Sequence, residues 1–307
     1  MSTESSRSDL CADRVVIITG AGRGIGRCHA LAFAAAGAKV VVNDLGTSGS
    51  GEGASAGPAA DVVAEIEAMG GRGLASTHDI ADFEQAGELV KQTLAHFGGL
   101  DVVVNNAGIL RDRMFVSSTV DEWDAVMRVH LRGHYCVARH AAAYWRLESK
   151  AGRQPDARII NTSSGAGLQG SVGQSAYSAA KGGIASLTLV QAAELRRYGV
   201  TANALAPAAR TRMTEGPFAA MMAKPEEGFD AWAPENVSPI VVWLGSKQSA
   251  HVSGRCFEVQ GGMLRLSDGW RPSATVTQSE RWDPTQLGVA VDRILAEAPS
   301  PAPVYGT

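Results

Sequence analysis

Several residue types are scarce in this chain of 307 residues, and each scarcity excludes a class of protein. With 12 prolines and 19% charged residues, the composition is that of a globular protein, not of a disordered or fibrous one. No apolar run approaches the roughly 20 residues that a membrane helix needs. The first residues, MSTESSRSDLCA, lack the apolar stretch of a signal peptide. We therefore expect an intracellular protein with no membrane partner.

Cysteine and unbalanced charge are also lacking. The four cysteines stand singly, with no CxxC spacing, at Cys11, Cys28, Cys136 and Cys256. This pattern suits a reducing compartment, so we expect the cytoplasm, and it gives no sign of a zinc site. The net charge is -3, with acidic and basic residues interspersed. Nucleic-acid surfaces concentrate positive charge, and we therefore expect no nucleic-acid partner.

Short apolar runs alternate with longer stretches of helical periodicity from about residue 10 to residue 265. RVVIIT precedes GIGRCHALAFAAAGA, and ARIINTS precedes SAYSAAKGGIASLTLVQAAELRRYG. The short runs are apolar throughout, as in parallel strands that helices cover on both faces. We predict one doubly wound α/β domain over residues 1–266. Residues 267–307 form a C-terminal extension that we expect to pack on the domain or at a subunit interface.

The first predicted strand runs directly into TGAGRGIGR. Glycines at this position let the backbone turn tightly and approach a pyrophosphate, which then faces the N-terminus of the following helix. The alternative is a glycine-rich turn with no ligand, but the strand before it and the helix after it favour a dinucleotide. We expect the cofactor contacts Gly20, Arg23, Gly24, Ile25 and Gly26.

Polar residues follow the next strands, at the edge of the sheet where such folds bind ligands. Asp44 ends the second strand, about 20 residues beyond the glycine turn, where a carboxylate can accept both ribose hydroxyls of an adenosine. A 2'-phosphate would meet like charge there, which favours NAD over NADP, although Arg23 could receive a phosphate. As a lone residue, Asp44 could equally start a turn.

Two further strand ends extend this set of cofactor contacts. HDI holds Asp79 and Ile80, of which Asp79 could meet the adenine amine. NNAG holds Asn106, Ala107 and Gly108, which could line a ribose. Each motif alone is a weak signal, because such tetrads are common in turns.

The segment NTSSGAGLQGSVGQSAYSAAK, residues 161–181, places seven side-chain hydroxyls ahead of one lysine. Tyr177 and Lys181 are four residues apart in a helix-forming stretch, so both project from one face. An ammonium beside a phenol favours the phenolate and lowers a pKa that starts near 10. Such a pair can move a proton at neutral pH. The alternative is a surface tyrosine and lysine that touch casually.

Together, TGAGRGIG, NNAG, a serine thirteen residues before a tyrosine, and YSAAK resemble the short-chain dehydrogenase/reductase family over residues 10–265. The resemblance implies a Rossmann-type, seven-stranded parallel sheet with helices on both faces, a nicotinamide cofactor, and a homodimer or homotetramer. It implies a catalytic centre of Ser164, Tyr177 and Lys181, of which Tyr177 and Lys181 also contact the cofactor, with Pro207 and Thr211 covering the nicotinamide. The thirteen-residue interval selects Ser164 over the neighbouring Ser163.

VVNDLG, NNAGILRDR, RVHLRG, APAARTRMT and FEVQGG are similar to the (3R)-hydroxyacyl-CoA dehydrogenase branch found in peroxisomal multifunctional enzymes of type 2. This similarity implies an NAD-dependent oxidoreductase acting on a 3-hydroxyacyl-CoA. The alternatives are a dehydrogenase or ketoreductase for a sterol or simple secondary alcohol, and a non-catalytic NAD-binding sensor or scaffold.

This chain has His130 where many family members place an asparagine, which is thought to hold a helix irregularity and a water of the proton relay. His130 could keep that role, add a proton-shuttling imidazole, or be merely structural.

The segment from Thr211 to Pro234 is expected to cover the substrate, an acyl-CoA or a sterol-like molecule. It carries flexible apolar side chains that can line a site for a greasy group, or can pack on their own helix. These side chains are Met213, Phe218, Met221, Met222, Phe229 and Trp232.

Overall fold

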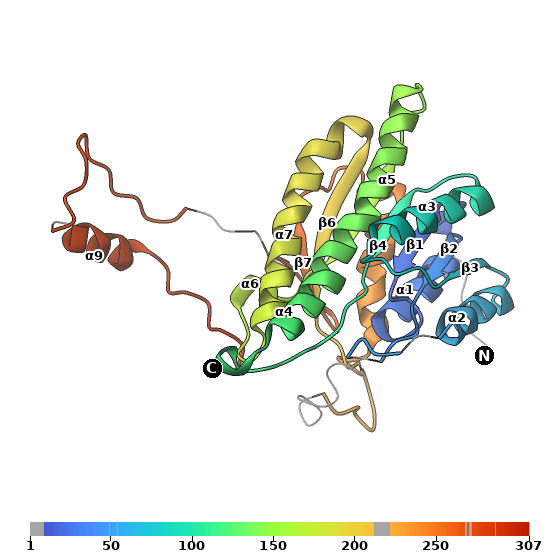
Figure 1. Cartoon of the computed structure of the whole chain (residues 1–307), viewed down its shortest axis with the longest axis horizontal. Helices are drawn as coiled ribbons and strands as arrows, with labels where there is room; N and C mark the ends of the chain where they lie inside the picture. Colours follow the sequence, from blue (N-terminus) through green and yellow to red (C-terminus); the bar gives the residue numbers. More distant parts are fainter. Residues whose placement is uncertain are drawn as a thin grey trace.

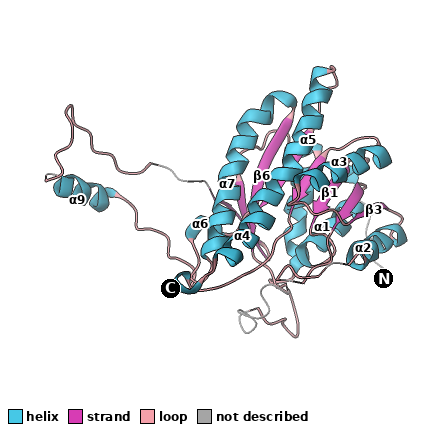
Figure 2. Cartoon of the chain, viewed as in Figure 1, coloured by secondary structure: helices cyan, strands magenta, loops and turns pink. Residues whose placement is uncertain are grey.

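The structure is a computed structural model of the chain. It describes residues 9–48, 50–53, 55–211, 222–267, 269, 272–285 and 287–306. One sheet with helices on both faces forms the body of the molecule (Figures 1 and 2). The order of its strands is β3-β2-β1-β4-β5-β6-β7-β8. In chain order they are β1 (Val15–Thr19), β2 (Lys39–Asn43), β3 (Arg72–Ser76), β4 (Val102–Asn105), β5 (Ala157–Thr162), β6 (Val200–Pro207), β7 (Cys256–Gln260) and β8 (Met263–Ser267).

The predicted doubly wound α/β architecture is confirmed, but the sheet has an eighth strand beyond the seven expected. β1 to β7 pair in parallel, whereas β8 pairs with β7 antiparallel, with Gln260 opposite Met263. Gly261 and Gly262 make the two-residue connection, and Gly261 has a φ of 53°. Glycine adopts this left-handed conformation without strain, so the pair closes a hairpin. β8 therefore forms one edge of the sheet.

Each face of the sheet has its own apolar core, because alternate residues of a strand point to opposite faces. Val16 and Ile18 of β1 pack with residues of α1, α2 and α8, while Ile17 between them packs with residues of α3 and α5. The helices are α1 (Gly24–Ala35), α2 (Gly57–Ala68), α3 (Phe83–Phe97), α4 (Val120–Met127), α5 (Gly133–Lys150), α6 (Gly165–Gln169), α7 (Ser175–Leu195), α8 (Ser238–Gly245) and α9 (Leu287–Glu297). Among the described residues, none of the helices combines the length and the apolar character that crossing a membrane requires.

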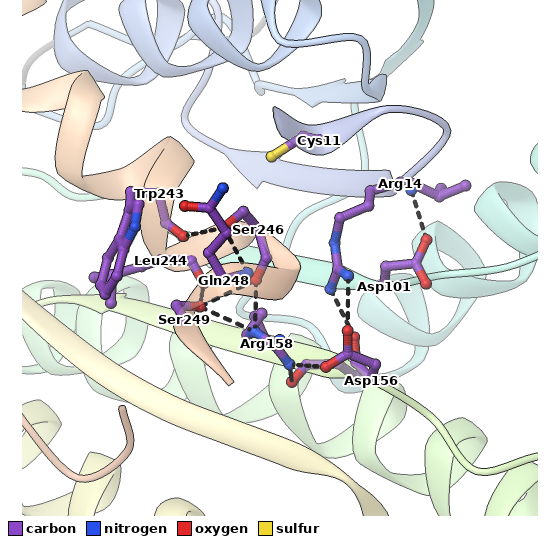
Figure 3. A network of polar contacts seen from close by, with 12 residues as sticks. Cys11, Arg14, Asp101, Asp156, Arg158, Trp243, Leu244, Ser246, Gln248 and Ser249 are labelled. Atoms are coloured by element: carbon purple, nitrogen blue, oxygen red, sulfur yellow. Dashed lines mark hydrogen bonds and ion pairs between the residues drawn. The ribbon is translucent and has the colours of Figure 1, made fainter. Parts of the chain in front are cut away.

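A charged cluster closes the amino edge of the sheet (Figure 3). Arg14 and Arg158 both pair with the carboxylate of Asp156, at N–O distances of 3.3 and 2.6 Å. Arg158 is 1% exposed, and its Nε donates to the carbonyl of Ser246 and the hydroxyl of Ser249, both at 3.1 Å. The cluster thus ties β5 to the chain just before β1 and to the turn after α8.

The C-terminal extension leaves the sheet after β8. Figure 1 shows α9 away from the body of the molecule, and none of the helix residues is buried. The last described residues, 304–306, return to the body, where Tyr305 forms an isolated parallel bridge with Ser171. The extension therefore touches the domain at its end.

A buried histidine joins the first and eighth helices. His29 of α1 is 1% exposed, and its Nδ1 lies 2.9 Å from the hydroxyl of Ser238 in α8. Burial lowers the pKa of His29 from 6.5 to about 3. The folded protein therefore resists a protonation that the unfolded chain accepts below pH 6.5.

We predict that His29→Gln flattens the dependence of stability on pH between 6.5 and 3. In the native protein His29 favours folding above this window, and its contribution is lost as the pH falls, by about 1.4 kcal/mol per pH unit. Urea unfolding at pH 7, 6 and 5 measures the slope. The exposed His251 provides the control His251→Gln, which should leave the slope unchanged. Equal slopes for His29→Gln and the native chain would contradict the prediction.

Candidate active site

A cavity of about 870 Å³ lies at the carboxyl ends of the parallel strands. Every predicted catalytic residue and cofactor contact contributes to its lining, from the first glycine turn to the segment after β6. These residues are Gly20, Arg23, Gly24, Ile25, Gly26, Asp44, Asp79, Ile80, Asn106, Ala107, Gly108, His130, Ser164, Tyr177, Lys181, Pro207 and Thr211. Segments that are far apart in the sequence therefore line the same cavity.

The glycine turn is packed too tightly for side chains. A Cβ on Gly20, whose φ is 63°, would lie 2.7 Å from the Cα of Ala107. A Cβ on Gly26 would lie 2.2 Å from the carbonyl oxygen of Gly20 and 2.5 Å from Nδ2 of Asn106. That Nδ2 donates to the carbonyls of Thr19 and Gly20, which fastens the end of β4 to the turn after β1. Such a bare backbone at a helix N-terminus fits a pyrophosphate.

Asp44 stands beside this turn, just after β2. Its Oδ2 accepts the amide of Gly22 at 2.8 Å, and its Oδ1 accepts the amide of Gly46 at 2.7 Å. Each carboxylate oxygen keeps a second lone pair for a ligand hydroxyl. Arg23 is exposed and donates to the carbonyl of Thr47 at 3.2 Å. The adenosine end of a dinucleotide fits these groups.

Asp79 has a partner that the sequence did not reveal. Its Oδ2 pairs with the guanidinium of Arg128 at 2.5 Å, and its Oδ1 accepts the amide of Ala81 at 2.9 Å. Arg128 also lines the cavity. The carboxylate at this position is therefore already paired with a cation at the rim of the cavity.

Ser164, Tyr177 and Lys181 meet where β5 ends and α7 begins. Ser164 is the N-cap of α6, and its Oγ accepts the amide of Ala166 at 3.2 Å. Lys181 is 2% exposed, and its Nζ donates to the carbonyl of Thr162 at 2.5 Å. The same Nζ lies 5.6 Å from the centre of the Tyr177 ring. The neighbouring Ser163 instead donates its hydroxyl to the carbonyl of Lys181 at 2.8 Å, which gives it a structural contact.

The electrostatics of this group differ from the expectation for an exposed lysine and tyrosine. Burial raises the pKa of the Tyr177 phenol, and a hydrogen bond with Ser164 opposes the rise. Burial also lowers the pKa of Lys181 to about 7. The prediction of a lowered phenol pKa is therefore wrong for the protein without bound cofactor, because desolvation disfavours the charged forms of both Tyr177 and Lys181. Near pH 7, the charged and neutral forms of Lys181 therefore lie close in free energy.

His130 lies in a π-helical turn, η3 (Arg128–Arg132), between α4 and α5. The ring is 1% exposed, and its Nε2 lies 3.0 Å from the amide nitrogen and 2.8 Å from the carbonyl oxygen of Ile109. It stands edge-on to the Tyr177 ring, with centres 5.2 Å apart. Burial, with a smaller effect of the Lys181 charge, lowers the pKa of His130 to about 3. The imidazole is therefore neutral at physiological pH.

The cavity also has lining residues that the sequence gave no reason to select. Asp112 accepts a hydrogen bond from Nε2 of Gln174 at 2.9 Å, and burial raises the pKa of Asp112. Tyr305 and Gly306 line the cavity from the far end of the chain. Asp112 could have been suspected, because it follows NNAG closely. Tyr305 carried no motif and no periodicity.

The expected apolar cover of the substrate end is found in part. Met222 and Trp232 line the cavity, and Met222 is 6% exposed. Phe229 is 66% exposed and does not contribute to the lining, so the prediction for this residue is wrong. Its position in an exposed loop explains the difference. Met213, Phe218 and Met221 lie outside the described residues.

Comparison with known proteins now decides the family. The sequence profile of the short chain dehydrogenases matches residues 14–220, which include the glycine turn, Ser164, Tyr177 and Lys181. The chain belongs to this short-chain dehydrogenase family. As a member, the dehydrogenase is an oxidoreductase that uses a nicotinamide cofactor.

Similar proteins are known in several organisms. The dehydrogenase is 44% identical over 298 residues to the hydroxyacyl-CoA dehydrogenase ChsB1 of Mycobacterium tuberculosis, covering 93% of this chain and 91% of that protein. It is 45% identical over 252 residues to peroxisomal multifunctional enzyme type 2 of Mus musculus, covering 82% of this chain but 32% of that enzyme. A crystal structure of a short chain dehydrogenase from Mycobacterium avium has 57% identity and a TM-score of 0.88, covering 97% of this chain and all of that one.

We predict that Gly26→Ala weakens NADH binding by about tenfold or more, since each tenfold loss corresponds to about 1.4 kcal/mol. The added methyl would collide with the carbonyl of Gly20 and the side chain of Asn106. Fluorescence titration with NADH measures the affinity. Gly99→Ala is the matched control, because its Cβ would meet only the Tyr144 hydroxyl, at 3.9 Å. Equal affinities for the two variants would show that the glycine turn does not bind the pyrophosphate.

Proposed function

We propose that this chain is an NAD-dependent dehydrogenase that interconverts the secondary alcohol of a 3-hydroxyacyl-CoA and its ketone. One observation carries the proposal: Ser164, Tyr177 and Lys181 meet in a cavity that the glycine turn after β1 also lines. The identity of 44% to a hydroxyacyl-CoA dehydrogenase, over nearly the full length of both chains, supports the choice of substrate.

The bound nicotinamide would supply the hydride acceptor or donor of this reaction. As the phenolate, Tyr177 takes the proton of the alcohol in oxidation; as the phenol, it gives that proton to the ketone oxygen in reduction. The Oγ of Ser164 accepts the amide of Ala166, and its hydroxyl would donate to the substrate oxygen once a substrate replaces the hydrogen bond with Tyr177. Lys181, with a pKa of about 7, is suited to exchange protons with the phenol at physiological pH and to bind a ribose hydroxyl.

His130 acts as a positioning residue in this proposal. Its ring lies perpendicular to the Tyr177 ring, and Nε2 bonds to the backbone of Ile109. A pKa of about 3 keeps the imidazole neutral, which argues against a role as a cationic proton carrier. A Cβ on Gly108 would lie 2.3 Å from Cε1 of His130. The NNAG segment therefore packs against the π-helical turn through the His130 ring.

Tyr177→Phe should lower kcat by about a hundredfold or more while NADH still binds, because it removes only the proton-carrying hydroxyl. Initial rates with 3-hydroxybutyryl-CoA and NAD measure the effect, and NADH fluorescence verifies that the cofactor site is intact. Tyr135→Phe, on α5 and outside the cavity lining, is the control. Unchanged turnover in Tyr177→Phe would exclude this mechanism.

Asp44 carries the proposed preference for NAD. Its carboxylate faces the position of the adenosine ribose and would repel a 2'-phosphate. Asp44→Ala should raise the ratio of kcat/KM with NADP to that with NAD by about tenfold, or about 1.4 kcal/mol. Asp61→Ala removes the same charge from the exposed surface of α2 and should leave the ratio unchanged. A ratio that Asp44→Ala does not move would assign cofactor choice to another group.

A sterol or a simple secondary alcohol is the second candidate substrate, because the apolar Met222 and Trp232 could pack against a ring system as well as an acyl chain. Rates with 3-hydroxyacyl-CoA, sterol and simple alcohol panels separate the two. Membership of a family of dehydrogenases argues against a non-catalytic sensor or scaffold.

The assembly and the compartment are further parts of the proposal. α4 and α5 expose Trp123 and Leu147, which favours a homodimer or homotetramer built on these helices. All four cysteines are free thiols, as in a cytoplasmic protein. Light scattering of the purified chain measures its mass in solution.

A further inference from the structure

The end of the chain forms part of the wall of the active site. The amide of Val172 donates to the carbonyl of Tyr305 at 2.9 Å, and the amide of Tyr305 donates to the carbonyl of Gly170 at 3.2 Å. Two backbone hydrogen bonds thus pin residue 305 to the loop between α6 and α7. This loop leads into the helix that carries Tyr177 and Lys181.

The Tyr305 side chain lies against Gly165, the residue that follows Ser164. A Cβ on Gly165 would lie 2.6 Å from the Tyr305 hydroxyl oxygen and 2.8 Å from Cε2 of its ring. The phenol ring therefore occupies the space that any larger residue at position 165 would fill. Tyr305 and Gly306 both line the cavity.

Tyr305 presents a neutral and mostly apolar surface to the cavity. Burial and the carboxylate of Glu258 raise the pKa of Tyr305, so the phenol keeps its proton at physiological pH. The neighbouring Val172 packs against Gly306, whose added Cβ would lie 3.3 Å from the valine Cβ. A tyrosine ring has few rotatable bonds, so it presents a fixed surface to a substrate.

We propose that Tyr305 is a specificity-determining residue, whose ring limits the width of the acyl group accepted beside Ser164. The inference rests on the proposed 3-hydroxyacyl-CoA activity. It makes Tyr305, near the C-terminus, the residue that determines which acyl groups the enzyme accepts. The ring stands where a branch or a ring system near the hydroxyl-bearing carbon would need space. Removing the ring opens the cavity on the side of Gly165. The kcat/KM for bulky substrates then rises relative to that for small substrates.

Tyr305→Ala tests the proposal. The ratio of kcat/KM for a branched or ring-bearing 3-hydroxyacyl-CoA to that for 3-hydroxybutyryl-CoA should rise about tenfold, the size of effect that pocket volume produces. Tyr305→Phe keeps the ring and should keep the native ratio, and the KM for NAD should not change in either variant. Tyr135→Ala is the matched control, because Tyr135 and Tyr305 are both 46% exposed and Tyr135 does not line the cavity. An unchanged ratio in Tyr305→Ala would overturn the proposal.

A second measurement needs no substrate. Deleting residues 304–307 removes the Tyr305 carbonyl that accepts the Val172 amide, so amide hydrogen exchange at Val172 should become about tenfold faster. The amide of Arg113, which donates to Gly173 in the same loop, should exchange at its native rate. Unchanged exchange at Val172 would show that the C-terminus does not lie on the loop, and would overturn the wall. If the native chain oxidises no hydroxyacyl-CoA while Val172 behaves as expected, the substrate assignment fails and the wall stands.

Discussion

The parallel pairing of β4, β5 and β6 is the constraint on which the site depends. Asn105 stands opposite Asn161 in this ladder, and the side chains of the two residues bond at 2.9 Å. Nδ2 of Asn161 then donates to Thr188 and Gln191 of α7, at 2.9 and 2.8 Å. The buried amides thereby set the position of the helix against the strands, and with it the approach of Lys181 to the carbonyl of Thr162. A shift of α7 along the sheet would break the bonds of Asn161 to this helix together with the bond from Lys181 to Thr162.

Sequence reasoning succeeded where a requirement of the backbone shows in the residue types. Gly20 and Gly26 lie in a turn that admits no side chain at either position, so both must be glycine, and Asp44 beside this turn accepts the amide of Gly22. It failed where the outcome depends on burial. The ionisation of Tyr177 and Lys181 follows from how much water the fold removes, which spacing does not express. It also could not reach Tyr305, which meets the site through a contact between distant segments of the chain.

Two buried histidines near Lys181 affect the site as neutral groups. His130 and His134 lie one turn apart, both are buried, and the pKa of each lies below its ordinary value. The desolvation that lowers these values also acts on Lys181, which contributes to the shift of both rings. A second positive charge beside the lysine would oppose its protonation. Neutral rings therefore leave the lysine pKa near the working pH.

The cluster of Arg14, Asp156 and Arg158 has a consequence for how such a protein can diversify. It lies at the amino edge of the sheet, whereas the cavity lies at the carboxyl edge, so the two regions are well separated. The effects of substitutions at well-separated sites add up nearly independently. Residues that line the cavity, the chain end included, can thus vary while the opposite edge keeps the sheet together. Related chains can acquire new substrates through such changes at little risk to folding.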